Sequence, residues 1–106
     1  MKLLIKIKYE RIIAKKILRE FWTVHEDCEQ ALLEWFHQVS KATYESPIQV
    51  KQAFPSASIL NNNRIVFNIK GNSYRLIVRA NYDYQMLWVR FVGTHAEYDK
   101  VDANII

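Results

Sequence analysis

Residues 64–92, RIVFNIKGNSYRLIVRANYDYQMLWVRFV, decide the fold because they hold three short apolar runs separated by turn-forming residues. The runs 64–70, 73–80 and 86–92 are rich in β-branched and aromatic side chains, which is typical of strands. Gly71-Asn72 between the first two runs predicts a two-residue hairpin turn that pairs Lys70 with Ser73. The apolar pairs that this register puts on one face are Ile69 with Tyr74, Phe67 with Leu76 and Ile65 with Val78.

A second turn at Asp83-Tyr84 predicts how the third strand pairs with the second. The pairs on the same face are then Leu76 with Phe91, Val78 with Val89 and Ala80 with Leu87. A slip of one residue would bring polar side chains onto this face, so the agreement supports the register. We expect an antiparallel sheet whose apolar face is covered by helices.

The opposite face of this sheet collects basic side chains and carries no acid. A solvated sheet face usually mixes charges of both signs, so the bias favours a surface that holds phosphates and stacks bases. An ordinary solvated face remains the alternative. The cations and the indole predicted there are Arg64, Lys70, Arg75, Arg79, Arg90 and Trp88. Asn68, Val66, Ile77, Met86 and Val92 are expected among them.

The N-terminal half predicts an extended segment followed by helices. Residues 1–13 alternate apolar and basic side chains, which indicates a strand. Residues 14–25 carry an apolar stripe at helical spacing. A second helix follows, with Asp27 as its N-cap and Gln30 at the capping-box position. Ser46-Pro47 predicts the start of a short third helix that ends before Pro55.

These elements together predict an α+β fold in which two N-terminal helices pack on a small antiparallel sheet. The chain has 106 residues with only two glycines and two prolines, so it offers no flexible linker. We therefore expect one domain over residues 1–106, with 1–11 as an extra strand or an extension.

Composition narrows the function classes. The net charge of +4 suggests an anionic partner. The single cysteine, Cys28, excludes a disulfide framework and favours a core thiol. Lysines interrupt the first apolar run, so no signal peptide forms, and no stretch is long enough to span a membrane. Histidine and acid spacing suggests no metal site, and Gly71 stands alone, so there is no phosphate loop. We expect a cytoplasmic protein without cofactor or metal.

Beyond Val92 the chain reads GTHAEYDKVDA (93–103), and this run carries a family resemblance. Together with NNNRIVFNIKGNSYRLIV (61–78) it resembles the signature of the HigB toxins within the RelE/ParE group. KKILREFW (15–22), ALLEWF (31–36) and VKQAFPSASIL (50–60) are similar to the first half of that family. The resemblance covers about residues 12–106.

The resemblance implies a two-helix half packed on a small antiparallel sheet. It also implies cleavage of messenger RNA on the translating ribosome. The partner that it implies is a HigA-like helix-turn-helix antitoxin, which neutralises the toxin and through which alone operator DNA is contacted. No membrane partner is expected.

Metal-free RNA cleavage needs a proton-transfer group and cations at the scissile phosphate. Histidine is the side-chain type best suited to proton transfer at neutral pH, and His95 follows Val92, which the predicted register pairs with Arg75. Thr94 is expected to cap a short helix that places Tyr98 one turn from His95. We assign catalysis to His95, Arg75 and Tyr98. RNA contacts are assigned to Lys70, Arg79, Arg90, Arg64, Trp88 and Lys51.

Other roles stay open for several of these side chains. His95 alone could be a capping or packing histidine, and the Tyr98 ring could pack in the core. Glu97 or Asp99 could orient His95 or simply be exposed. His25 and His37 lie among acids on the helical half, which favours structural roles.

Two rival functions remain at this point. A ParE-like toxin would bind DNA gyrase without cutting RNA, although such a protein would not need a histidine beside its arginines. A degenerate toxin would act only as a corepressor bound to its antitoxin.

Overall fold

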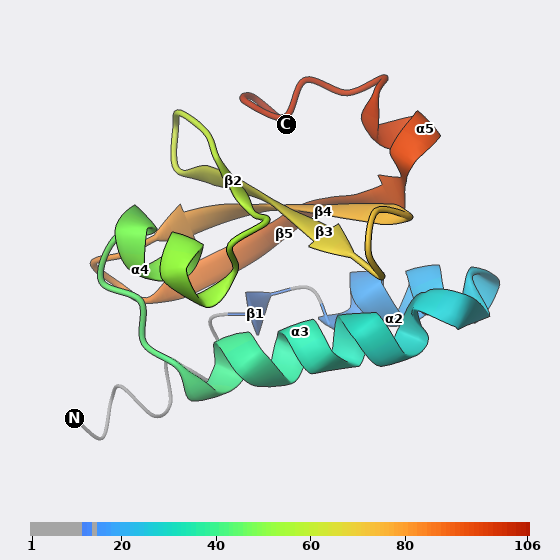
Figure 1. Ribbon diagram of the computed structural model, residues 1–106, viewed down its shortest axis with the longest axis horizontal. Coiled ribbons are helices and arrows are strands. Elements are labelled where there is room, and N and C mark those ends of the chain that lie inside the picture. The colour runs from blue at the N-terminus through green and yellow to red at the C-terminus, as the bar shows by residue number, and fades with distance from the viewer. Residues whose placement is uncertain (1–11, 14) are drawn as a thin grey trace.

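The computed structural model describes residues 12–13 and 15–106, so the strand expected over residues 1–13 lies outside the described residues except at 12–13, which are a strand (Figure 1). The helices are α2 (Lys15–Val24), the 3-10 helix η1 (Glu26–Cys28), α3 (Glu29–Lys41), α4 (Pro47–Ala53) and α5 (His95–Tyr98). The strands are β1 (Ile12–Ile13), β2 (Ser58–Ile59), β3 (Arg64–Ile69), β4 (Tyr74–Asn81) and β5 (Met86–Thr94).

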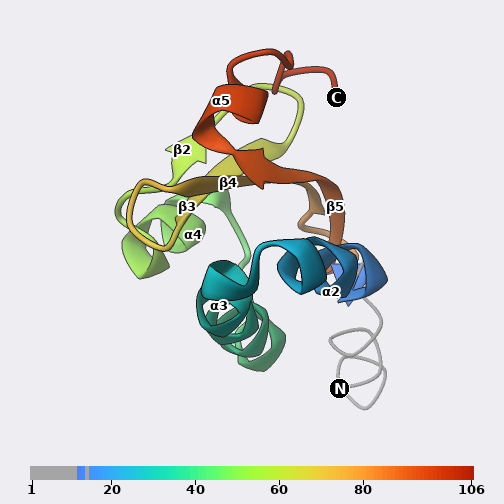
Figure 2. The same ribbon diagram turned by 90° about the vertical axis from the view of Figure 1, so that its right-hand side faces the viewer.

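The strands form one sheet in the order β1-β5-β4-β3-β2. β2, β3, β4 and β5 pair antiparallel, whereas β1 runs parallel to β5. Helices α2 and α3 lie against one face of the sheet, and α5 with the chain after it lies on the other face (Figures 1 and 2). The expected α+β architecture, with two N-terminal helices packed on a mainly antiparallel sheet, is confirmed.

The main core fills the space between the helices and the sheet. Apolar side chains at helical spacing on α2 and α3 meet every second residue of β3 and β4, and Leu87, Val89 and Val92 of β5. Leu18, Leu32, Leu76 and Val78 are fully buried in this cluster. The free thiol of Cys28 is buried there as well, as expected for a core cysteine.

The expected helix cap at Asp27 is wrong. Helix α3 begins at Glu29 with Cys28 in the N-cap position, and no side chain caps it. The carboxylate of Asp27 instead accepts hydrogen bonds from Lys70 and Tyr74 across the layer boundary. The start of α4 is confirmed, since Ser46 occupies the N-cap position and Pro47 the first turn, although the Ser46 side chain makes no capping hydrogen bond.

The predicted register of β3 and β4 is confirmed over its whole length, from Ile65 with Val78 to Ile69 with Tyr74. The register of β4 and β5 is confirmed only next to their turn, where Val78 pairs with Val89 and Ala80 with Leu87.

A β-bulge overturns the rest of the expected β4–β5 register. β5 has one extra residue, Arg90, between the residues that pair with Val78 and Ile77. Leu76 therefore pairs with Val92 instead of Phe91, and Arg75 pairs with Gly93. Such a bulge turns the side chains beyond it to the other face. Val92 accordingly packs against the main core, and Phe91 packs on the opposite side.

The face expected to be open is partly covered. A second apolar cluster forms on it where Val66, Ile77 and Ala103 are buried. Side chains from α5 and the chain that follows complete this cluster, and Figure 2 shows this segment lying over the sheet. The partly buried members are Leu60, Phe91, Tyr98, Val101 and Ile106.

Candidate functional site

Helix α5 begins with the cap that the sequence predicts. The Thr94 hydroxyl accepts a hydrogen bond from the Glu97 N–H at 3.2 Å, and the Glu97 carboxylate accepts one from the Thr94 N–H at 2.8 Å. This reciprocal pair is a capping box. Glu97 is therefore part of the cap, and the cap fixes the turn that carries His95 and Tyr98.

Arg75 is a buried cation, 8% exposed, on the same face as α5. Its guanidinium donates to the main-chain oxygen of Asn72 at 3.0 Å, to the side-chain oxygen of Asn72 at 2.8 Å and to the Tyr74 oxygen at 3.3 Å. Its Cζ lies 5.7 Å from the centre of the Tyr98 ring. Neighbouring oxygens and an aromatic face thus hold the group in one orientation.

His95 meets Arg75 through two intermediaries. The rings of His95 and Tyr98 are edge to face with their centres 6.5 Å apart. The main-chain N–H of His95 donates a hydrogen bond to the main-chain oxygen of Ser73 at 3.3 Å, which fastens α5 to the β3–β4 turn. We call Asn72, Arg75, His95, Tyr98 and Asp99 the α5 cluster.

Asp99 is the acid beside the imidazole. Its Oδ2 lies 3.3 Å from His95 Nδ1, and both side chains are about half exposed. Of the two acids that the sequence left open as partners of His95, the contact is made by Asp99, because Glu97 is committed to the cap.

The route between His95 and Arg75 differs from the one expected. Val92 does not pair with Arg75; Gly93 does, and a larger residue there would have to displace neighbouring side chains. A Cβ at Gly93 would come within 2.5 Å of Cζ of Phe91 and 2.9 Å of Oε1 of Glu97. The missing side chain lets β5 turn directly into the cap of α5.

Arg79 and Trp88 form a second feature of this face. They are paired across β4 and β5, and Cζ of Arg79 lies 5.6 Å from the centre of the indole. The guanidinium beside an indole that the register predicts is therefore present, and the Arg79 side chain is exposed.

Arg64 and Arg90 gather around Ile106 rather than around the α5 cluster. Arg64 donates through Nε and Nη2 to the main-chain oxygen of Ile106 at 3.1 and 2.9 Å, and Arg90 Nε donates to the same oxygen at 3.4 Å. These two cations stay on the expected face, where the last residues of the chain lie over them.

Two of the expected RNA-contacting lysines lie elsewhere. Lys70 has a positive φ of 53° in the turn, and its ammonium pairs with Asp27 of the helical layer at 2.8 Å. The prediction that Lys70 lies on the open face is therefore wrong. Lys51 lies on α4 and donates to the Ala57 oxygen at 2.5 Å, so it is also separate from the α5 cluster.

Sequence reasoning missed Asn72 because Gly71-Asn72 has the composition of an ordinary turn. The one available signal was its position three residues before Arg75, from which a turn residue can fold back onto the strand. That signal is too common to single out a functional residue.

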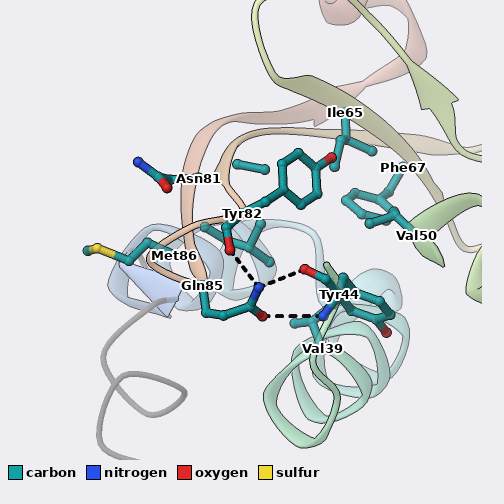
Figure 3. A pocket seen from close by; sticks show the side chains of 11 residues that line it. Val39, Tyr44, Val50, Ile65, Phe67, Asn81, Tyr82, Gln85 and Met86 are labelled. Carbon is teal, nitrogen blue, oxygen red and sulfur yellow. Dashed lines mark hydrogen bonds between the residues drawn. The ribbon is translucent and has the colours of Figure 1, made fainter. Parts of the chain in front are cut away.

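The small pocket between α3, α4 and the β4–β5 turn is not part of this arrangement (Figure 3). Its lining is apolar apart from amides and phenols. The Gln85 side-chain amide donates hydrogen bonds there to the main-chain oxygens of Tyr44 and Tyr82. Burial raises the pKa of Tyr82 here. With no charged side chain among its described lining residues, this pocket does not suit a phosphate.

Nothing in the described ranges, 12–13 and 15–106, brings three histidine, cysteine or acidic side chains together as metal ligands. Over the same residues, no helix has the length and apolar character needed to cross a membrane.

Residues 28–101 match a protein family described as HigB_toxin, RelE-like toxic component of a toxin-antitoxin system. The chain is 27% identical over 90 residues to a protein of Escherichia coli K12 named mRNA interferase toxin HigB, an alignment that covers 83% of this chain and 86% of the relative. It is 26% identical over 92 residues to the mRNA interferase HigB of Escherichia coli O6:H1, covering 85% and 89%.

Proposed function

This chain belongs to the HigB family of RelE-like toxins, the toxic components of toxin–antitoxin systems, and from that membership we propose that it is an endoribonuclease that cleaves messenger RNA. Relatives aligned over most of the chain are named mRNA interferases, which supports this activity. We extend the proposal to cleavage on the translating ribosome and to neutralisation by a HigA-like helix-turn-helix protein that carries the pair to operator DNA.

The observation that carries the proposal is that the Arg75 guanidinium and the His95 ring both lie against the ring of Tyr98. Three of the five N–H groups of Arg75 bind Asn72 and Tyr74, which leaves two for an oxygen of the scissile phosphate. A guanidinium held in advance stabilises the extra charge of the phosphorane without reorganising during the reaction.

His95 exchanges the proton in this mechanism. Because Asp99 faces Nδ1, the other ring nitrogen is left for the substrate. The 2′-hydroxyl attacks the phosphate, the P–O5′ bond breaks, and a 2′,3′-cyclic phosphate and a 5′-hydroxyl result. One proton leaves the 2′-oxygen and one reaches the 5′-oxygen. Tyr98 positions the substrate or shares this transfer.

Arg79 and Trp88 extend the surface away from the α5 cluster. An exposed guanidinium over an indole suits a phosphate next to a stacked base. We assign the RNA strand to this pair, with Arg64 and Arg90 beyond it.

The first prediction concerns the substrate. We expect the purified protein to cleave messenger RNA on translating ribosomes and to cleave the same RNA poorly when it is free, because the chain belongs to the HigB family and carries no recognisable base-reading motif. Primer extension on both substrates measures this. Equally fast cleavage of free RNA would contradict ribosome dependence, and no cleavage of either would contradict the nuclease.

The second prediction concerns the reacting groups. His95→Ala and Arg75→Ala should each slow single-turnover cleavage by roughly ten- to a thousand-fold, the range for a lost proton-transfer or charge-stabilising group. At saturating ribosomes, His37→Ala on α3 is the matched control and should cleave at the wild-type rate. A His95→Ala protein that matched this control would remove the histidine from the mechanism.

A further inference from the structure

We propose that Asp27, on the helical side of the sheet, is a positioning residue for the α5 cluster. Asp27 holds the segment 70–74, and this segment in turn holds Arg75 and His95. This inference rests on the proposed nuclease function, because Asp27 would stabilise the nuclease site from the opposite side of the sheet.

Asp27 grips this segment at both of its ends. Its Oδ2 accepts a hydrogen bond from the Lys70 ammonium at 2.8 Å, and its Oδ1 accepts one from the Tyr74 hydroxyl at 2.5 Å. The two side chains come from opposite ends of the β3–β4 turn. A single carboxylate therefore closes the turn against η1.

The residues between these two anchors make the contacts that shape the candidate site. Asn72 and the Tyr74 oxygen receive the three hydrogen bonds of the Arg75 guanidinium. The Ser73 oxygen receives the N–H of His95. A shift of the turn would therefore move both reacting groups at once, and a displacement of about 1 Å can reduce a rate by as much as a hundred-fold.

Aromatic packing gives the Tyr74 hydroxyl its direction. The Tyr74 ring is 7% exposed and meets the rings of Phe21 and His25 edge to face, with centres 5.7 and 5.6 Å away. Phe21 and His25 are stacked on each other at 4.3 Å. The ring is confined on the helical side, so its hydroxyl is held at Asp27.

The protonation states of Asp27 and Tyr74 favour the hydrogen bond between them at neutral pH. Hydrogen bonds from Lys70 and Tyr74 lower the pKa of Asp27, which keeps the carboxylate ionised at neutral pH. The hydrogen bond to Asp27 raises the pKa of Tyr74 to about 12, so the phenol keeps the proton that it donates. Both groups therefore have the protonation states that this contact needs at neutral pH.

The test uses Asp27→Asn, which keeps the shape of the side chain, and Tyr74→Phe, which removes only the hydroxyl. Glu26→Gln is the matched control, because it removes a charge from the neighbouring residue of η1, an exposed side chain that makes no ion pair with any described residue. Two quantities are measured: the single-turnover rate at saturating ribosomes, and hydrogen exchange at the amides of residues 72–75 and 95–98.

We expect Asp27→Asn and Tyr74→Phe to lower the rate by roughly ten-fold while ribosome affinity stays near that of the control. Exchange should accelerate at residues 72–75 and 95–98 but not in α3. The double variant should be little slower than the slower single variant, because both changes cut the same tie.

A wild-type rate and wild-type local exchange in Asp27→Asn would overturn the proposal. Faster exchange throughout the protein would also overturn it, because Asp27 would then stabilise the fold without positioning the site. If the wild-type protein cuts no RNA, the nuclease function fails, and the exchange measurement still decides whether Asp27 holds the turn.

Discussion

The three arginines along β3 and β4 are used in different ways, although they share one face. Arg75 is buried, and Asn72 and Tyr74 hold its guanidinium. Arg64 is bound to the main chain of Ile106. Arg79 is exposed and lies over an indole, which leaves its charge facing solvent. At the scale of single residues, we therefore propose that Arg79 contacts RNA phosphates and that Arg75 acts at a fixed point of the reaction.

Arg79→Glu should weaken binding to ribosomes and lower the salt slope of that binding by about one ion per lost phosphate contact. The thermal midpoint should change little, because the side chain is exposed. Lys16→Glu makes the same charge change on α2, where the side chain is 83% exposed, and should bind as the wild type does. Equal weakening by both variants would assign the effect to net charge rather than to this face.

Residue roles on this face were predictable only where the register fixed them. Alternation along β4 gives the direction of Arg75 and Arg79 directly. It says nothing about Lys70, whose positive φ takes it out of the strand and toward Asp27. Nor does it reveal Asn72, because a turn residue is not bound by strand alternation.

At the scale of elements, the junction between β5 and α5 does the most to shape the candidate site. The β-bulge at Arg90 turns Phe91 toward the second apolar cluster. Gly93 then allows the close approach, and Thr94 caps α5. Thr94 was predictable as a cap because its hydroxyl and Glu97 stand at capping-box spacing. The bulge was not, since Leu76 meets an apolar partner in either register, Phe91 or Val92.

Thr94→Val tests this junction, since it keeps the volume of the side chain and removes the oxygen that accepts the Glu97 N–H. Losing the cap should cost about 1 kcal/mol of unfolding free energy. Cleavage should fall further than this loss of stability explains, because His95 and Tyr98 stand in the turn that the cap begins. Urea titration and single-turnover rates measure the two effects. Thr43→Val, in the exposed loop before α4, is the control. A Thr94→Val protein as active as this control would contradict the prediction.

At the scale of the whole molecule, the sheet separates two apolar clusters that use alternate residues of the same strands. The main cluster joins the helices to the sheet, and the smaller one joins the segment after β5 to the other face. Hydrophobic periodicity predicted the first, because the helices and strands repeat their apolar side chains regularly. It did not predict the second, because the chain after Tyr98 is irregular, so the face between the arginines was expected to be open.

The last prediction is that the helices and the sheet unfold together. The chemical reactivity of the Cys28 thiol measures this. The thiol is fully buried, and burial raises its pKa to about 11. At pH 8 roughly one thiol in a thousand would then be ionised in the folded protein, and iodoacetamide attacks only the thiolate. A lower pH suppresses the folded-state reaction further, and unfolding restores an ordinary thiol pKa. Cys28 should therefore react in urea over the same range in which circular dichroism reports loss of helix and sheet, as cooperative unfolding requires.

A Lys16→Cys variant, whose added thiol is exposed, should take up one label at once at every urea concentration and marks the fast limit. Labelling of Cys28 well before the circular dichroism change would show that the helical layer opens on its own, and that residues 12–106 do not unfold as one unit.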